Sequence, residues 1–212
     1  MDIEPPLGLR ETKKQETRQL ISDHATRLFQ RQGFEATTIA EIAAAARVAK
    51  KTVTNYFARK EDLALDHHEE FVASLARAVD SREPGESALA ALRRAFVAAL
   101  RERDPVAGFA GPVFARMITD SPTLTARLRE LHDQRERALA EALAGATGAS
   151  ADDIVPRAAA AQLAAAQRLL FVRIQELTLA GHRDARIAKT LDAEAGRVFD
   201  QLEPALGRFA VR

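Results

Sequence analysis

Residues 33–63, "GFEATTIAEIAAAARVAKKTVTNYFARKEDL", contain the signals of two short helices joined by a tight turn. Thr38 and Glu41 have the T-x-x-E spacing of a capping box, which predicts a helix start at Thr38. A break at residues 47–49 separates this helix from another expected at about residues 50–57. Gly33 marks the end of a longer preceding helix. A long helix followed by two short ones is the order of a helix-turn-helix DNA-binding unit.

The last of these helices has an apolar and a polar side. Val53 and Phe57 lie four residues apart and are expected to pack inward. Lysines on the opposite side suit phosphates or guanine, asparagine suits adenine, and a threonine methyl suits thymine. A tyrosine hydroxyl at the edge of this face, and a lysine at the start of the next helix, could each donate to a phosphate. The candidate DNA-contacting residues are therefore Lys50, Lys51, Thr54, Asn55, Tyr56 and Lys60. A plain solvated face is the competing interpretation, and the order of the flanking helices favours DNA binding.

Charge is unevenly distributed along the 212 residues, although the net charge is only +1. Residues 1–60 carry 11 Lys and Arg against 7 Asp and Glu, a net charge of 11 − 7 = +4. Residues 61–212 carry 20 against 23, a net charge of 20 − 23 = −3. The N-terminal part is therefore expected to meet a polyanion. Cysteine is absent, and no signal peptide or membrane-spanning run is found, so we expect a soluble cytoplasmic protein.

The whole chain follows a helical period, since apolar residues recur at three and four positions rather than two. We predict an all-α protein of about nine helices in three parts: a flexible arm at 1–11, a three-helix helix-turn-helix domain at 12–60, and a larger helical domain at 61–212. The expected helices cover 12–32, 38–46, 50–57, 61–81, 86–103, 106–119, 122–145, 152–180 and 184–206. The segment "DPVAGFAGPVF" makes a poor regular helix, so we expect a break there, either a moving element or a corner.

Residues 12–65 resemble the DNA-binding region of the TetR family of bacterial transcriptional regulators. The residues that fall in register with the family pattern are Gly33, Phe34, Thr37, Thr38, Ile42, Ala43, Ala46, Val48, Thr52, Phe57, Lys60, Glu61 and Leu63. The resemblance implies that Thr38 contacts a phosphate and that residues 50–56, Thr52 included, form the recognition helix. Three positions depart from the pattern: Arg47 replaces the turn glycine, Ala49 the capping serine, and Thr54 the first of two aromatic residues.

The resemblance also implies a C-terminal domain that binds a small molecule and dimerises through its last two helices. The pattern supports this, because the helix at 152–180 is apolar nearly all round and the last helix carries an apolar stripe. We therefore predict a homodimer that binds a pseudopalindromic DNA operator. The candidate interface residues are Leu170, Ile174, Leu177, Leu191, Val198, Phe199 and Leu202. The alternative is that these residues pack only within one chain.

The ligand is less well defined by the sequence. His132 and Arg135 interrupt the apolar face of the helix at 122–145, and a buried polar group needs a partner, for which a bound ligand is one candidate. The alternatives are that these groups lie at the edge of the apolar face or pair with Asp or Glu of a neighbouring helix. An apolar cavity could be lined by Phe71, Phe96, Phe109, Phe114, Met117 and Phe171, each of which could equally be plain core. We expect a largely apolar small-molecule effector whose binding releases the DNA.

An enzyme is not indicated, because the phosphate-binding glycine motifs, the G-x-S-x-G elbow and di-iron spacings are all missing. The string "DHHEE" at 66–70 is a poor metal site, since adjacent histidines on a helix point about 100° apart. We predict no cofactor and no metal. The competing function is a helix-turn-helix protein of the same fold that organises DNA or answers to a protein partner without a small ligand.

Overall fold

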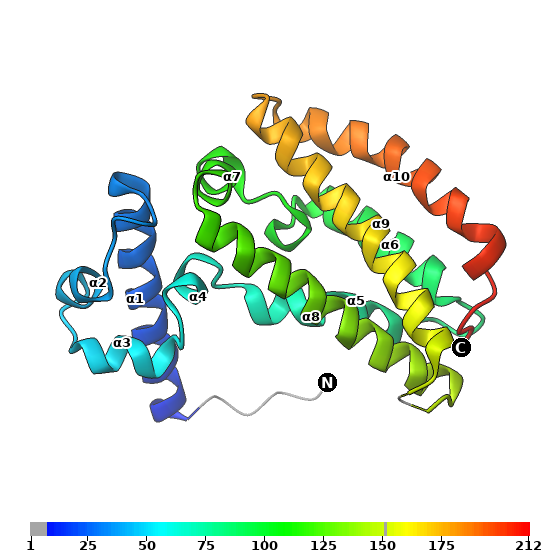
Figure 1. The fold of residues 1–212 in the computed structure, drawn as a ribbon, viewed down its shortest axis with the longest axis horizontal. Coiled ribbons are helices and arrows are strands. Elements are labelled where there is room, and N and C mark those ends of the chain that lie inside the picture. The colour runs from blue at the N-terminus through cyan, green and yellow to red at the C-terminus, as the bar shows by residue number, and fades with distance from the viewer. Residues whose placement is uncertain (1–7, 151) are drawn as a thin grey trace.

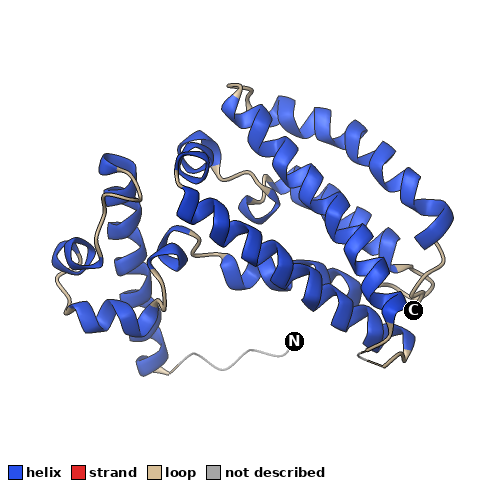
Figure 2. Ribbon diagram, in the orientation of Figure 1, coloured by secondary structure: helices blue, strands red, loops and turns tan. Residues whose placement is uncertain are grey.

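The computed structural model describes residues 8–150 and 152–212. These residues form ten α-helices and one 3-10 helix, without a strand (Figures 1 and 2). The elements are α1 (Leu9–Gln32), α2 (Ile39–Ala45), α3 (Lys50–Tyr56), α4 (Lys60–Ala64), α5 (His68–Asp80), α6 (Ala88–Glu102), η1 (Pro105–Ala107), α7 (Gly111–Asp120), α8 (Pro122–Thr147), α9 (Ile154–Leu179) and α10 (Asp184–Leu206). The predicted all-α class is confirmed. None of the described helices is long and apolar enough to cross a membrane.

Three helix boundaries differ from the prediction. The single helix expected at 61–81 is two helices, α4 and α5, because the chain turns at Leu65 and buries this side chain. The segment at 106–119 is also divided, since Gly108 has a φ of 123° and its Cα lies so close to Ile174 that a Cβ there would be 3.2 Å from it. Helix α1 begins at Leu9 instead of residue 12. The predicted arm at 1–11 falls mainly on residues 1–7, outside the described part of the chain.

Two apolar cores hold the molecule together, and α8 contributes to both. The first core joins helices α1 to α4 to Leu124 and Leu131 of α8. The second joins α5, α6, α9 and α10 to Leu139 and Leu143, about two and three turns beyond Leu131 along α8. Figure 1 shows α8 running from the helix-turn-helix end to the far end of the molecule. A movement of α8 would therefore change the packing of both cores.

Polar contacts reinforce this junction. Arg127 of α8 pairs with Asp62 of α4 at 2.9 Å, and both side chains are nearly buried. Glu130 of α8 accepts from Arg59 at 2.9 Å and from Arg127 at 3.0 Å. Ser121, which caps α8, also donates a hydrogen bond to Glu35, and this bond is the main reason that the pKa of Glu35 is lowered. Ion pairs and a hydrogen bond thus hold the start of α8 against the helix-turn-helix, in addition to apolar packing.

Four of the seven predicted dimer-interface residues lie inside their own chain. Leu170, Ile174, Leu191 and Phe199 lie in the second core of their own chain and are at most 2% exposed. Leu177, Val198 and Leu202 are half-buried against the same core. Helix α9 leaves a different apolar row uncovered, consisting of Leu169, Val172 and Leu179. A helix that is apolar nearly all round does not indicate from its sequence which side faces the core.

Candidate nucleic-acid interface and ligand cavity

The turn between α2 and α3 is built by local contacts. Thr38 and Glu41 form the predicted capping box: the Thr38 N–H donates to Glu41 at 2.8 Å, and the Glu41 N–H donates to Thr38 Oγ1 at 3.2 Å. Arg47 adopts a φ of 55°, so the turn keeps the left-handed conformation without the glycine that favours it. Ala49 occupies the N-cap position of α3 and supplies no side-chain hydrogen bond. Two of the three departures from the family pattern thus leave the turn in place.

Helix α3 exposes the polar face that the sequence predicts. Val53 and Phe57 are fully buried in the first core. Exposed side chains on the other side are those of Lys50, Lys51, Thr54 and Asn55, while Thr52 and Tyr56 are half-buried. Among the described residues, neither lysine takes part in an ion pair. This face therefore presents free ammonium, amide and hydroxyl groups to an approaching polyanion.

One anchor of α3 was not predicted from the sequence. Arg18 of α1 donates to the Tyr56 carbonyl at 3.1 Å and lies 4.6 Å from the centre of the Phe57 ring. It holds the C-terminal end of α3 against α1. Arg18 precedes Ile21 and Ala25 by three and seven positions on the same side of α1, so its helical spacing could have indicated an inward direction.

The Lys60 ammonium makes contacts within the helix-turn-helix that the sequence did not predict. Its ammonium donates to the carbonyls of Phe34 at 2.9 Å and Thr37 at 3.0 Å, and lies 4.1 Å from the centre of the Phe34 ring. These contacts close the loop between α1 and α2. Thr38, in contrast, is exposed at the start of α2, where a phosphate can approach it.

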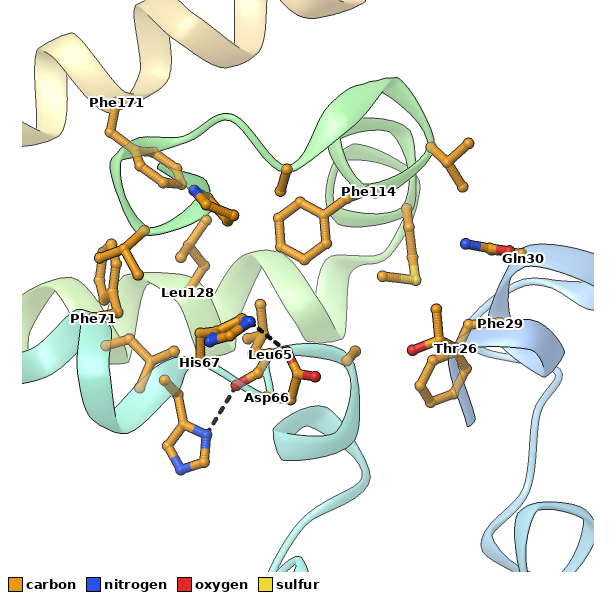
Figure 3. A pocket seen from close by; sticks show the side chains of 18 residues that line it. Thr26, Phe29, Gln30, Leu65, Asp66, His67, Phe71, Phe114, Leu128 and Phe171 are labelled. Carbon is orange, nitrogen blue, oxygen red and sulfur yellow. Dashed lines mark hydrogen bonds and ion pairs between the residues drawn. The ribbon is translucent and has the colours of Figure 1, made fainter. Parts of the chain in front are cut away.

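A cavity of about 300 Å³ lies where the helix-turn-helix meets the larger domain (Figure 3). Its walls come from α1, the α4–α5 connection, α7, α8 and α9, and they are mainly apolar. Four predicted ligand residues line it: Phe71, Phe114, Met117 and Phe171. Helix α1 contributes Thr26, Phe29 and Gln30, which the sequence did not indicate, since they become neighbours of the cavity only through the packing of the two domains.

The other predicted ligand residues lie elsewhere. Phe109 is buried in the second core and lines neither this cavity nor a smaller one of about 170 Å³. The smaller cavity is lined by Phe96 and Arg135. His132 is buried, with its ring edge-on to Phe71 and Phe171 at centre distances of 5.0 and 5.4 Å. Burial, together with the positive charges of Arg135 and Arg168, lowers the pKa of His132 to about 4.

The comparisons with known proteins agree with this geometry. Residues 21–66 match the family model of bacterial regulatory proteins, tetR family, and residues 86–206 match that of the MftR C-terminal domain. The chain is 34% identical over 151 residues to the HTH-type transcriptional regulator TcmR of Streptomyces glaucescens, covering 69% of this chain and 67% of that protein.

Solved structures give the same fold. A TetR-family transcriptional regulator from Syntrophomonas wolfei has 16% identity and a TM-score of 0.59, over 88% of this chain and 96% of that one. The repressor FadR of Thermus thermophilus, solved with lauroyl-CoA, has 26% identity and a TM-score of 0.50, over 89% and 95%. The chain therefore belongs to the TetR family of bacterial regulatory proteins, which are DNA-binding regulators of transcription.

Proposed function

We propose that this chain is a repressor that binds a pseudopalindromic operator as a homodimer and is released by a small, largely apolar ligand. The carrying observation is that α1 serves both sites. Its residues Thr26, Phe29 and Gln30 line the cavity, and its Arg18 holds α3. A ligand in the cavity would therefore press on the helix that supports the DNA-contacting face.

The DNA contacts are assigned by side-chain chemistry. Lys50 and Lys51 bind phosphates or guanine acceptors, Asn55 pairs with adenine, and Thr54 contacts a thymine methyl. Tyr56, Thr38 and Thr52 position the domain through backbone phosphates. Lys60 has its main role in the domain core, and any phosphate contact it makes adds to that role.

Two copies are needed because one seven-residue helix reaches few base pairs. The apolar row of Leu169, Val172 and Leu179 on α9 is our revised candidate for the dimer interface. The apolar lining of the cavity supports a largely apolar ligand. FadR was solved with lauroyl-CoA, whose acyl chain is apolar.

The operator can be obtained by selecting bound sequences from random DNA with the purified full chain. We expect one short pseudopalindrome, and binding that is indifferent to sequence would contradict the proposal. Asn55→Ala should then reduce the preference for operator over random DNA by about 1 to 3 kcal/mol. Tyr56→Phe is the matched comparison, because loss of a hydroxyl that contacts only a phosphate weakens all sequences alike. Equal losses on both DNAs for Asn55→Ala would remove its base-contacting role.

A further inference from the structure

Arg135 is a buried cation without an ion pair among the described residues, and the Asp104 carboxylate acts on its charge only at longer range. The side chain is 7% exposed, yet its guanidinium has one hydrogen-bond partner among the described residues, Ser74 Oγ at 2.9 Å, and no carboxylate within ion-pair distance. The Nε atom makes that bond. Burial lowers the pKa of Arg135 to about 10, so the group is still charged at neutral pH. Burying such a charge unpaired costs free energy that a purely structural residue would not require.

The guanidinium faces open space. Arg135 lines the smaller cavity together with Ser74, Arg77, Asp104 and Gln167, and also borders a still smaller space next to His132 and Arg168. The Asp104 carboxylate accepts from the Val106 N–H at 2.8 Å, which commits it to the turn at η1. Arg77 pairs with Glu70 at 3.8 Å, so Arg135 is the arginine of this cavity without an ion pair among the described residues. Its guanidinium is a donor group that suits an anion.

The smaller cavity adjoins the larger one. Val106 and Phe171 line both. The Arg135 guanidinium lies 4.4 Å from the centre of the Phe71 ring, and Phe71 is part of the wall of the larger cavity (Figure 3). A cation thus stands one aromatic ring behind an apolar cavity. An apolar cavity next to a buried cation suits a molecule with an apolar body and an acidic end.

We propose that the smaller cavity is an anion subsite in which Arg135 binds the acidic group of an organic-acid effector, whose apolar body occupies the larger cavity. The inference rests on the proposed ligand-released repressor, and it adds the charge and polarity of the ligand to it. A bidentate guanidinium contact would supply the missing counter-charge.

Two fluorescent probes separate the charge from the apolar body. Anilinonaphthalene sulfonate and phenylnaphthylamine share one aromatic frame, and only the first carries an anionic group. We expect the full chain to bind the sulfonate more tightly. Arg135→Met should weaken the sulfonate by about tenfold or more, since a hydrogen bond to a charged group is worth about 1.5 to 3 kcal/mol. Binding of phenylnaphthylamine should change by less than about twofold, because methionine keeps the contact with Phe71.

Three controls make the result decisive. Arg101→Met removes an exposed arginine of α6, with the same change in net charge, and should leave both probes unaffected. Arg135→Lys should regain part of the sulfonate affinity. Phe114→Trp fills the larger cavity and should weaken both probes. The melting temperature of the unliganded Arg135→Met protein should be equal to or above that of the wild type, which shows that lost binding is not lost folding.

The outcomes distinguish the two proposals. If Arg135→Met binds both probes like the wild type while Phe114→Trp loses both, the anion subsite is wrong and the apolar ligand cavity stands. If Phe114→Trp also leaves both probes unchanged, the larger cavity is not the ligand site, and the ligand part of the proposed function fails with it. Selective loss of the sulfonate in Arg135→Met supports the anion subsite.

Discussion

Lys60 stabilises the loop between α1 and α2. Its ammonium donates to the carbonyls of Phe34, just after α1, and of Thr37, just before α2. Lys60→Ala should lower the free energy of unfolding by about 1 to 3 kcal/mol, because two partly buried carbonyls lose a charged donor. Lys51→Ala, at an exposed position without a partner, should change it by about 0.5 kcal/mol or less. Urea denaturation of both variants measures the difference, and equal stabilities would contradict the structural role of Lys60.

His132 makes the stability of the protein depend on pH. Its pKa is about 4 in the folded chain and near 6.5 when unfolded, so the unfolded state takes up the proton first as the pH falls. Stability is therefore complete above about pH 6.5 and declines towards pH 4. Between pH 7 and pH 5 the loss should be about 2 kcal/mol. His132→Phe should reduce that loss in urea denaturation at the two pH values, whereas parallel curves would show that the buried imidazole is not its source.

Residue roles were predictable where they depend on close neighbours in the sequence. The Thr38–Glu41 capping box and the inward direction of Val53 follow from spacings of three and four, and both are confirmed. Lys60 was assigned to a phosphate from its place at the start of a helix, whereas its contacts with carbonyls 23 and 26 positions away could not be predicted. Such a contact is decided by tertiary packing, which spacing along one helix does not contain.

Helix α3 begins without a side-chain cap. Ala49 has the extended backbone of an N-cap residue, with φ −68° and ψ 146°, and is exposed. Ala49→Ser should therefore raise the free energy of unfolding by about 0.5 to 1 kcal/mol, because the hydroxyl can accept from an unpaired N–H of the first turn. Ala44→Ser, at an exposed position inside α2, should lower it slightly. Urea midpoints decide between the two signs, and a loss of stability in Ala49→Ser would show that α3 does not start there.

Helix boundaries were predicted best where capping residues, proline or glycine mark them in the sequence. Ser121 followed by Pro122 gave the start of α8, and the structure has the cap and the proline in those places. The break between α4 and α5 has no proline or glycine to announce it. It arises because Leu65 turns into the core, an advantage that exists only once α1 and α8 are present. The side of α9 that faces the core likewise depends on its packing against α10, which the sequence of α9 alone does not contain.

Helix α8 connects the helix-turn-helix with the larger domain across the whole molecule. Asp62 and Arg127 form a nearly buried ion pair between α4 and α8, and the cavity touches α1, α8 and α9 together. A ligand that displaces α8 would act on the helix-turn-helix without passing through a flexible linker. Separating Asp62 from Arg127 would leave a nearly buried charge unpaired, which costs free energy. We therefore expect the helix-turn-helix and the larger domain to move together rather than independently.

We expect the protein to act as a dimer, because α9 leaves the apolar row of Leu169, Val172 and Leu179 uncovered. Leu169, at 59% exposure, is the most exposed member of that row. Leu169→Glu should place a charge in the interface and give a folded monomer in analytical ultracentrifugation. Its affinity for the selected operator should fall by about a hundredfold or more, since two half-sites are no longer linked. Val113→Glu, a similarly exposed position on α7, is the matched control for oligomeric state and should remain a dimer. A Leu169→Glu protein that still sediments as a dimer would move the interface away from α9, and one that is monomeric yet binds the operator at full strength would remove the need for two copies.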